Sequence, residues 1–134
     1  LMILGGGGWD QDACDDIRAM AQANGLPVSV TFRCQDRFDN NHDHYVGDLG
    51  SGPNPKLHER VRQADFLLVV GTSLAVMPAA SLLTYIDYDT PCALIDPDAD
   101  ALSPPGVLAI NTTAGEGVPA LVHQWRKQGN LLLP

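Results

Sequence analysis

Five short apolar segments constrain the fold of this chain more than any other feature. They are rich in leucine and β-branched residues, and they lack the sustained polar alternation of a sheet with one face in water. Both faces of each predicted strand should therefore be covered, as in a parallel sheet between two layers of helices. The five segments are Leu1–Leu4, Val28–Phe32, Phe66–Val70, Ala93–Ile95 and Val107–Ile110.

Stretches with helical periodicity alternate with these predicted strands. The first ends at Asn24-Gly25, and the second begins with Asn54 as its N-cap and Pro55 at the first helical position. A further, shorter helix is expected within Val76–Tyr85. Because alternating strands and helices imply right-handed crossovers, the sequence predicts one three-layer, Rossmann-like α/β domain over residues 1–134. The predicted apolar faces are Ala13, Ile17, Met20 and Ala21; Leu57, Val61 and Ala64; and Val118, Leu121, Val122 and Trp125.

The chain is acidic, with 16 Asp and Glu against 8 Lys and Arg and a formal charge of -8. Such a surface repels phosphodiester backbones and anionic lipids, which argues against nucleic-acid and membrane partners. Its three cysteines, Cys14, Cys34 and Cys92, form no CxxC pair, which favours a reduced, cytoplasmic setting. We expect Cys14 to be packed or half-packed on its helix and Cys34 to be the more exposed thiol.

The connection between the second and third predicted strands shows no sustained periodicity from Phe32 to Pro53, and it is rich in Asp, Asn, His and Gly. So long an irregular connection predicts either binding or packing against another domain. Asp39, His42, Asp43 and His44 include groups that can bind a metal. Their spacing is a weak metal signal, and it favours hydrogen bonds to solvent or to another domain.

A second acidic segment, Asp96–Asp100, is similar to the start of a calcium-binding loop. Ala101 and Val107 stand where such a loop requires glycine and glutamate. We therefore predict a solvated turn.

Four consecutive glycines, Gly5–Gly8, follow the first predicted strand and precede the first predicted helix. This is where a doubly wound fold places its phosphate-binding loop. The dinucleotide fingerprint is incomplete, because Asp10 takes the place of its third glycine and no acidic residue ends the second strand. Carboxylates in the first helical turns would also repel a diphosphate. The pattern favours a tight turn over phosphate binding, and the carboxylates are Asp10, Asp12, Asp15 and Asp16.

The third predicted strand runs directly into Gly71-Thr72-Ser73, at the edge of the sheet where open α/β folds bind ligands. This segment resembles the GTS motif of sirtuin deacylases. The chain lacks the glycine-rich loop, the catalytic histidine motif and the four zinc-binding cysteines that a sirtuin requires. The local likeness therefore favours a shared fold and not a shared reaction.

Taken together, these segments resemble the central domain of thiamine-diphosphate enzymes of the acetolactate synthase large-subunit type. The resemblance implies a DHS-like nucleotide-binding sheet with helices on both faces. It extends almost from end to end and is carried by Ile3–Gly8, Leu26–Gly50, Asn54–Leu74, Ala93–Leu102 and Leu108–Thr113.

The resemblance also implies a context. In that family the central domain lies between a pyrimidine-binding and a diphosphate-binding domain, which hold thiamine diphosphate and Mg²⁺. The segment Gly47–Gly50 is not the family's metal motif, because no Asn-Asn pair follows it. We therefore expect a middle domain that is inactive by itself, within a homo-oligomeric carboligase or decarboxylase acting on 2-oxo acids. The alternative is a free-standing module that binds an adenine nucleotide such as FAD or NAD.

Some members of the family bind FAD on this domain without redox chemistry. Here Ser73 stands where the family has an arginine, and Leu94 stands where it has an acidic residue. Each lost polar contact removes about 1–3 kcal/mol, so the resemblance favours a vestigial site and leaves FAD binding open. The corresponding contacts are Gly6, Gly7, Gly8, Thr31, Phe32, Arg33, Gly71, Thr72, Ser73 and Leu74.

Overall fold

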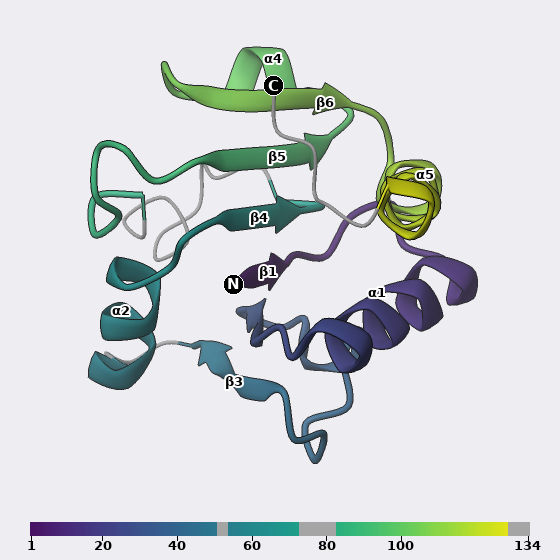
Figure 1. Ribbon diagram of the computed structural model, residues 1–134, viewed down its shortest axis with the longest axis horizontal. Coiled ribbons are helices and arrows are strands. Elements are labelled where there is room, and N and C mark those ends of the chain that lie inside the picture. Colours follow the sequence, from purple (N-terminus) through teal and green to yellow (C-terminus); the bar gives the residue numbers. More distant parts are fainter. Residues whose placement is uncertain (51–53, 73–82, 129–134) are drawn as a thin grey trace.

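In the computed structural model, residues 1–50, 54–72 and 83–128 are described. Within them, six parallel strands form one sheet in the order β3-β2-β1-β4-β5-β6 (Figure 1). This confirms the predicted parallel, Rossmann-like sheet. The strands are β1 (Met2–Leu4), β2 (Val28–Thr31), β3 (Tyr45–Leu49), β4 (Leu67–Val70), β5 (Cys92–Asp96) and β6 (Val107–Asn111).

The helices begin and end largely where their capping residues predict. Helix α1 (Gln11–Asn24) starts at Asp10, whose side chain accepts a hydrogen bond from the backbone N–H of Ala13, and it ends at Gly25 in a left-handed conformation (φ 63°). Asn54 caps helix α2 (Pro55–Arg62) in the same way. Helix α5 (Ala114–Gln128) follows β6. The helix expected within Val76–Tyr85 falls mostly on residues outside the described ranges.

Two hydrophobic cores lie on the two faces of the sheet. On one face α1 and α5 pack side by side over apolar residues such as Leu4 and Val70 (Figure 1). On the other, Leu57 and Val61 of α2 pack against Ile3 and its neighbours in the sheet. The strands are apolar on both faces because each face is covered.

From Phe32 to Gly50, the connection is more ordered than its sequence suggests. It contains a 3₁₀ turn, η1 (Gln35–Arg37), and the edge strand β3. The strand was missed because Gly47, at φ 106°, and Asp48 interrupt its apolar pattern. A register irregularity between Val28 and Val30 accompanies the interruption, and Ser29 Oγ donates a hydrogen bond to the carbonyl of Gly47 at 2.8 Å.

The acidic segment after β5 also differs from its prediction. Its first part is the expected turn, in which the N–H of Asp98 donates to the carboxylate of Asp96 at 3.0 Å. The chain then forms a short helix, α4 (Ala99–Leu102), because the side chain of Ala99 is buried against the sheet.

Candidate functional site

The order of the strands reverses between β1 and β4, and this is the switch point at which doubly wound sheets bind ligands. The structure brings Gly5–Gly8, after β1, against Gly71, after β4. The N–H of Gly5 donates to the carbonyl of Val70 at 2.7 Å, and that of Gly7 donates to the carbonyl of Gly71 at 3.1 Å. Two segments singled out in the sequence therefore meet at the carboxyl edge of the sheet, at the place where doubly wound folds have their ligand-binding crevice.

Glycine is required here by the close approach of the two backbones. A Cβ atom on Gly5 would lie 2.4 Å from the carbonyl oxygen of Gly71. Gly71 itself has a φ of 67°, and its Cβ would lie 2.6 Å from the carbonyl oxygen of Gly7. The tight packing that was predicted for the glycine loop is thus present, and nucleotide binding by the loop stays a prediction.

The other predicted contacts lie at the end of β2 and after β4. Thr31 ends β2, and its Oγ1 donates to the sulfur of Cys34 at 3.3 Å. Phe32 is 47% exposed, and the guanidinium of Arg33 lies 5.1 Å from the centre of its ring. Thr72 adjoins Gly5, since its Cβ would lie 2.6 Å from a Cβ there. Ser73 and Leu74 lie outside the described residues.

Cys34 is buried, and the prediction that it is the more exposed thiol is wrong. The chain turns immediately after β2, with the N–H of Cys34 donating to the carbonyl of Thr31 at 3.0 Å. This turn directs the side chain inward, to 3.1 Å from the position of a Cβ on Gly6. Cys14 is the more exposed of the two, and its half-packed position on α1 is confirmed.

Two residues of the crevice were not found from the sequence. Arg37 donates from Nη2 to the carbonyl of Gly6 at 3.3 Å, and its Nε is buried without a partner. The indole N–H of Trp9 is also buried without a partner, 2.9 Å from the position of a Cβ on Gly71. Buried donors without partners mark places that a water or a ligand could satisfy. The only signal in the sequence was that both residues adjoin a segment already singled out.

The titratable groups with shifted pKa values show no activated nucleophile. Burial raises the pKa of the Cys92 thiol to about 11. Burial also raises the pKa of Cys14, an effect that nearby Arg37 partly offsets. Since the thiolate is the reactive form, neither thiol is prepared for covalent chemistry.

His42 and His44, two of the metal-competent residues of the loop, form local contacts. His42 Nδ1 accepts a hydrogen bond from the N–H of His44 at 3.2 Å, and its ring contacts that of Phe38 edge to face. Over the described ranges, no three His, Cys, Asp or Glu side chains converge in a way that could hold a metal ion. None of the helices in these ranges is long and apolar enough to cross a membrane.

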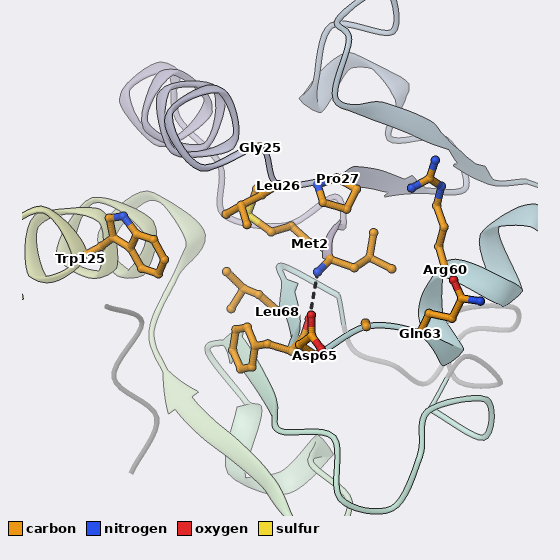
Figure 2. Close-up of a pocket in the computed structure, with 12 residues that line it drawn as sticks. Met2, Gly25, Leu26, Pro27, Arg60, Gln63, Asp65, Leu68 and Trp125 are labelled. Atoms are coloured by element: carbon orange, nitrogen blue, oxygen red, sulfur yellow. Dashed lines mark hydrogen bonds between the residues drawn. The ribbon is translucent and has the colours of Figure 1, made fainter. Parts of the chain in front are cut away.

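A separate cavity of about 530 Å³ lies at the opposite, amino edge of the sheet (Figure 2). Its lining is largely apolar, including Met2 and Trp125, and Arg60 and Asp65 add charge. The backbone nitrogen of Leu1 donates a hydrogen bond to the carbonyl of Phe66 at 2.9 Å. Because parallel sheets bind ligands at their carboxyl edge, this cavity is not the candidate nucleotide site.

Comparison with known proteins bears on the family and the fold. The family model described as "Thiamine pyrophosphate enzyme, central domain" matches residues 1–120. A sulfoacetaldehyde acetyltransferase from Rhodobacter capsulatus is 32% identical over 121 residues, covering 86% of this chain and 20% of that protein. An NAD-dependent protein deacylase from Helicobacter pylori is 47% identical over 55 residues, 40% of this chain and 24% of that protein. The chain thus spans about a quarter or less of the length of these curated relatives.

Proposed function

This chain belongs to the family of thiamine pyrophosphate enzyme central domains, and we propose that it is the structural middle domain of an acetolactate synthase-like carboligase or decarboxylase acting on 2-oxo acids. The observation that carries the proposal is the match over residues 1–120. Similarity to an acetyltransferase across 86% of the chain supports it. The deacylase similarity covers 40% of the chain and supports the nucleotide-type fold alone.

Thiamine diphosphate supplies the chemistry of such enzymes, because its ylid adds to a carbonyl and stores the carbanion left by decarboxylation. The described residues do not fit this cofactor, since they offer no converging ligand set for Mg²⁺. We infer that thiamine diphosphate and Mg²⁺ bind to flanking domains of the same polypeptide. This segment would then be inactive by itself.

We expect this domain to hold the neighbouring domains in position. Its sheet is covered by two cores, which suits a rigid body that positions its neighbours. The segment from Arg33 to Gly50 follows β2 and includes the edge strand β3, so it is the part that we expect at a domain interface or near the substrate channel. We further propose a cytoplasmic homo-oligomer for the full-length enzyme.

The crevice is proposed to be a vestige of an FAD site. The contacts expected for FAD lie around Gly6–Gly8, Thr31–Arg33 and Gly71–Leu74, but the amides of Gly5 and Gly7 already donate to carbonyls of the chain. Amides used in this way are not free to donate to a diphosphate. The alternative function, a free-standing nucleotide module, requires a crevice that still binds.

The intact mass of the native gene product separates the two functions. A polypeptide several times heavier than 14.3 kDa, with thiamine-dependent release of CO₂ from pyruvate or another 2-oxo acid, is the expected result. A native product near 14.3 kDa would overturn the enzyme proposal. Calorimetry with FAD, NAD and ADP then tests the alternative. It predicts saturable binding with a dissociation constant below about 100 μM, which corresponds to a binding free energy of about 5.5 kcal/mol.

A further inference from the structure

The chain leading into β5 carries an exposed aromatic turn. Residues 83–91 lie at the amino ends of the strands, beside α2, where the ring of Tyr85 stacks on that of His58 with their centres 4.6 Å apart (Figure 1). Over the described ranges, three large hydrophobic side chains are exposed, and two of them, Tyr85 and Tyr88, belong to this turn. Tyr88 is fully exposed, so its ring adds nothing to either core. Exposed tyrosines are frequent anchors of protein interfaces.

An apolar groove of about 540 Å³ lies on one side of Tyr88. Leu83 and Ile86 of the turn line it together with Val107 at the start of β6, and all three are only half-buried. Pro104, which is exposed, completes the apolar lining. Apolar side chains that remain accessible around one groove mark a surface that can bury a partner's apolar side chain.

A second hollow, of about 520 Å³, lies on the other side of Tyr88 and is acidic. The carboxylates of Asp65, Asp87 and Asp89 line it, with Arg62 as its cation. The guanidinium of Arg62 already pairs with Glu59 at 2.9 Å. Within the described part of the chain, Asp87 and Asp89 form no ion pair. The hollow therefore has an excess of negative charge that a cationic partner would complement.

We propose that the apolar groove, Tyr88 and the acidic hollow form one docking surface for a flanking domain of the same polypeptide. The docking segment would carry an arginine next to an apolar side chain. The guanidinium would lie over the ring of Tyr88 and donate to the carboxylates of Asp87 and Asp89, while the apolar side chain enters the groove. Arginine fits better than lysine because its planar group both stacks on a ring and binds a carboxylate through two hydrogen bonds. The partner belongs to a longer polypeptide, so this docking surface rests on the proposed function.

Charge also favours a flanking domain over a second copy of this surface. Two copies facing each other would bring Asp65, Asp87 and Asp89 of one chain against the same carboxylates of the other. The chain as a whole carries a formal charge of -8, which adds to this repulsion. A basic segment of a different domain meets neither penalty.

The test uses the full-length native protein, whose intact mass is measured on the same sample. Its tyrosines are acetylated with N-acetylimidazole, and the rate at each residue is followed by mass spectrometry of peptides. In the domain alone, exposure predicts that Tyr88 reacts fastest, followed by Tyr85 at 41% exposure and by half-buried Tyr45. If a flanking domain covers the surface, Tyr88 should react no faster than Tyr45.

A pair of double variants tests the charge. Asp87→Asn with Asp89→Asn removes two carboxylates from the docking surface, whereas Asp12→Asn with Asp98→Asn removes two exposed carboxylates from the opposite edge of the sheet. Labelling follows the population of the undocked state, so we expect the first variant to label about tenfold faster at Tyr88 than the wild type. Added salt should have the same effect on the wild type, and the control variant should not. Circular dichroism establishes that both variants are folded.

Four results would overturn the docking surface, and they differ in what they leave standing. A heavier native product in which Tyr88 still reacts fastest overturns the surface and leaves the proposed function intact. A native product near 14.3 kDa overturns the proposed function and this partner with it. Equal acceleration in the control variant would assign the effect to net charge. Loss of protection on dilution to single polypeptides would make a second copy the occupant.

Discussion

Replacing Gly5 with alanine tests the close packing at the carboxyl edge of the sheet. A Cβ atom at this position would lie 2.4 Å from the carbonyl oxygen of Gly71 and 2.6 Å from the Cβ of Thr72. The first of these is a backbone atom, so no side-chain rotation can relieve the contact. Overpacking destabilises proteins by about 1–3 kcal/mol, and we expect about 3 kcal/mol because the ends of β1 and β4 must move apart.

Urea unfolding followed by circular dichroism measures this loss as a change in the free energy of unfolding. For a domain of this size, about 3 kcal/mol corresponds to a decrease in Tm of roughly 10 °C. Gly7→Ala is the matched control in the same loop, because its Cβ would lie 3.8 Å from the same Gly71 oxygen, an ordinary contact. The reasoning is refuted if Gly5→Ala stays within about 1 kcal/mol of wild type, or if Gly7→Ala loses as much.

Three further predictions address the caps, the core and the pH dependence. Asn54→Ala should lower the free energy of unfolding by about 1 kcal/mol because α2 loses its N-cap, whereas Asn54→Asp, which keeps the cap, should lose little in the same urea titration. Leu57→Ala should cost about 2–5 kcal/mol because the side chain is fully buried, and Leu57→Met, measured alongside, should cost less than about 1.5 kcal/mol. Burial raises the pKa of Cys92 from 9.0 to about 11, so the folded state keeps a proton that the unfolded chain releases, and stability should fall as the pH rises between these two values. Unfolding at about pH 8 and about pH 10.5 measures this fall, and an equal fall in Cys92→Ala would contradict the assignment.

Much of the fold could be predicted because its signals are local. Burial of both sheet faces is visible in the apolar strands, and Asn54-Pro55 and Gly25 fix helix ends through backbone chemistry that any neighbouring structure would preserve. Strand β3 could not be predicted in this way. It is an edge strand whose pairing with β2 tolerates a glycine at φ 106° and a register shift, so tertiary pairing replaces the missing apolar pattern.

The residues of the candidate site also differ in whether a local sequence pattern predicts them. The glycine loop and Gly71 were found because strand ends and glycines are visible in one sequence. The contribution of Arg37 depends on how the connection after β2 folds back over Gly6, and that of Trp9 depends on its packing against Gly71 after β4. No local pattern encodes either contact. The burial of Cys34 has the same origin, since the turn that begins at Thr31 decides which way its side chain points.

The crevice also links the fold to the proposed structural role. An open diphosphate site needs backbone amides that are free to donate to a ligand, and buried donors without partners lower the stability of the unliganded domain. Here the amides of Gly5, Gly7 and Gly115 donate to carbonyls of the chain at 2.7, 3.1 and 2.6 Å. Donors used in this way stabilise the junction of β1, β4 and α5 whether or not a ligand is present. A middle domain that must hold its neighbours in place at every stage of a reaction benefits when its stability does not depend on a bound ligand. A nucleotide sensor gains no such benefit.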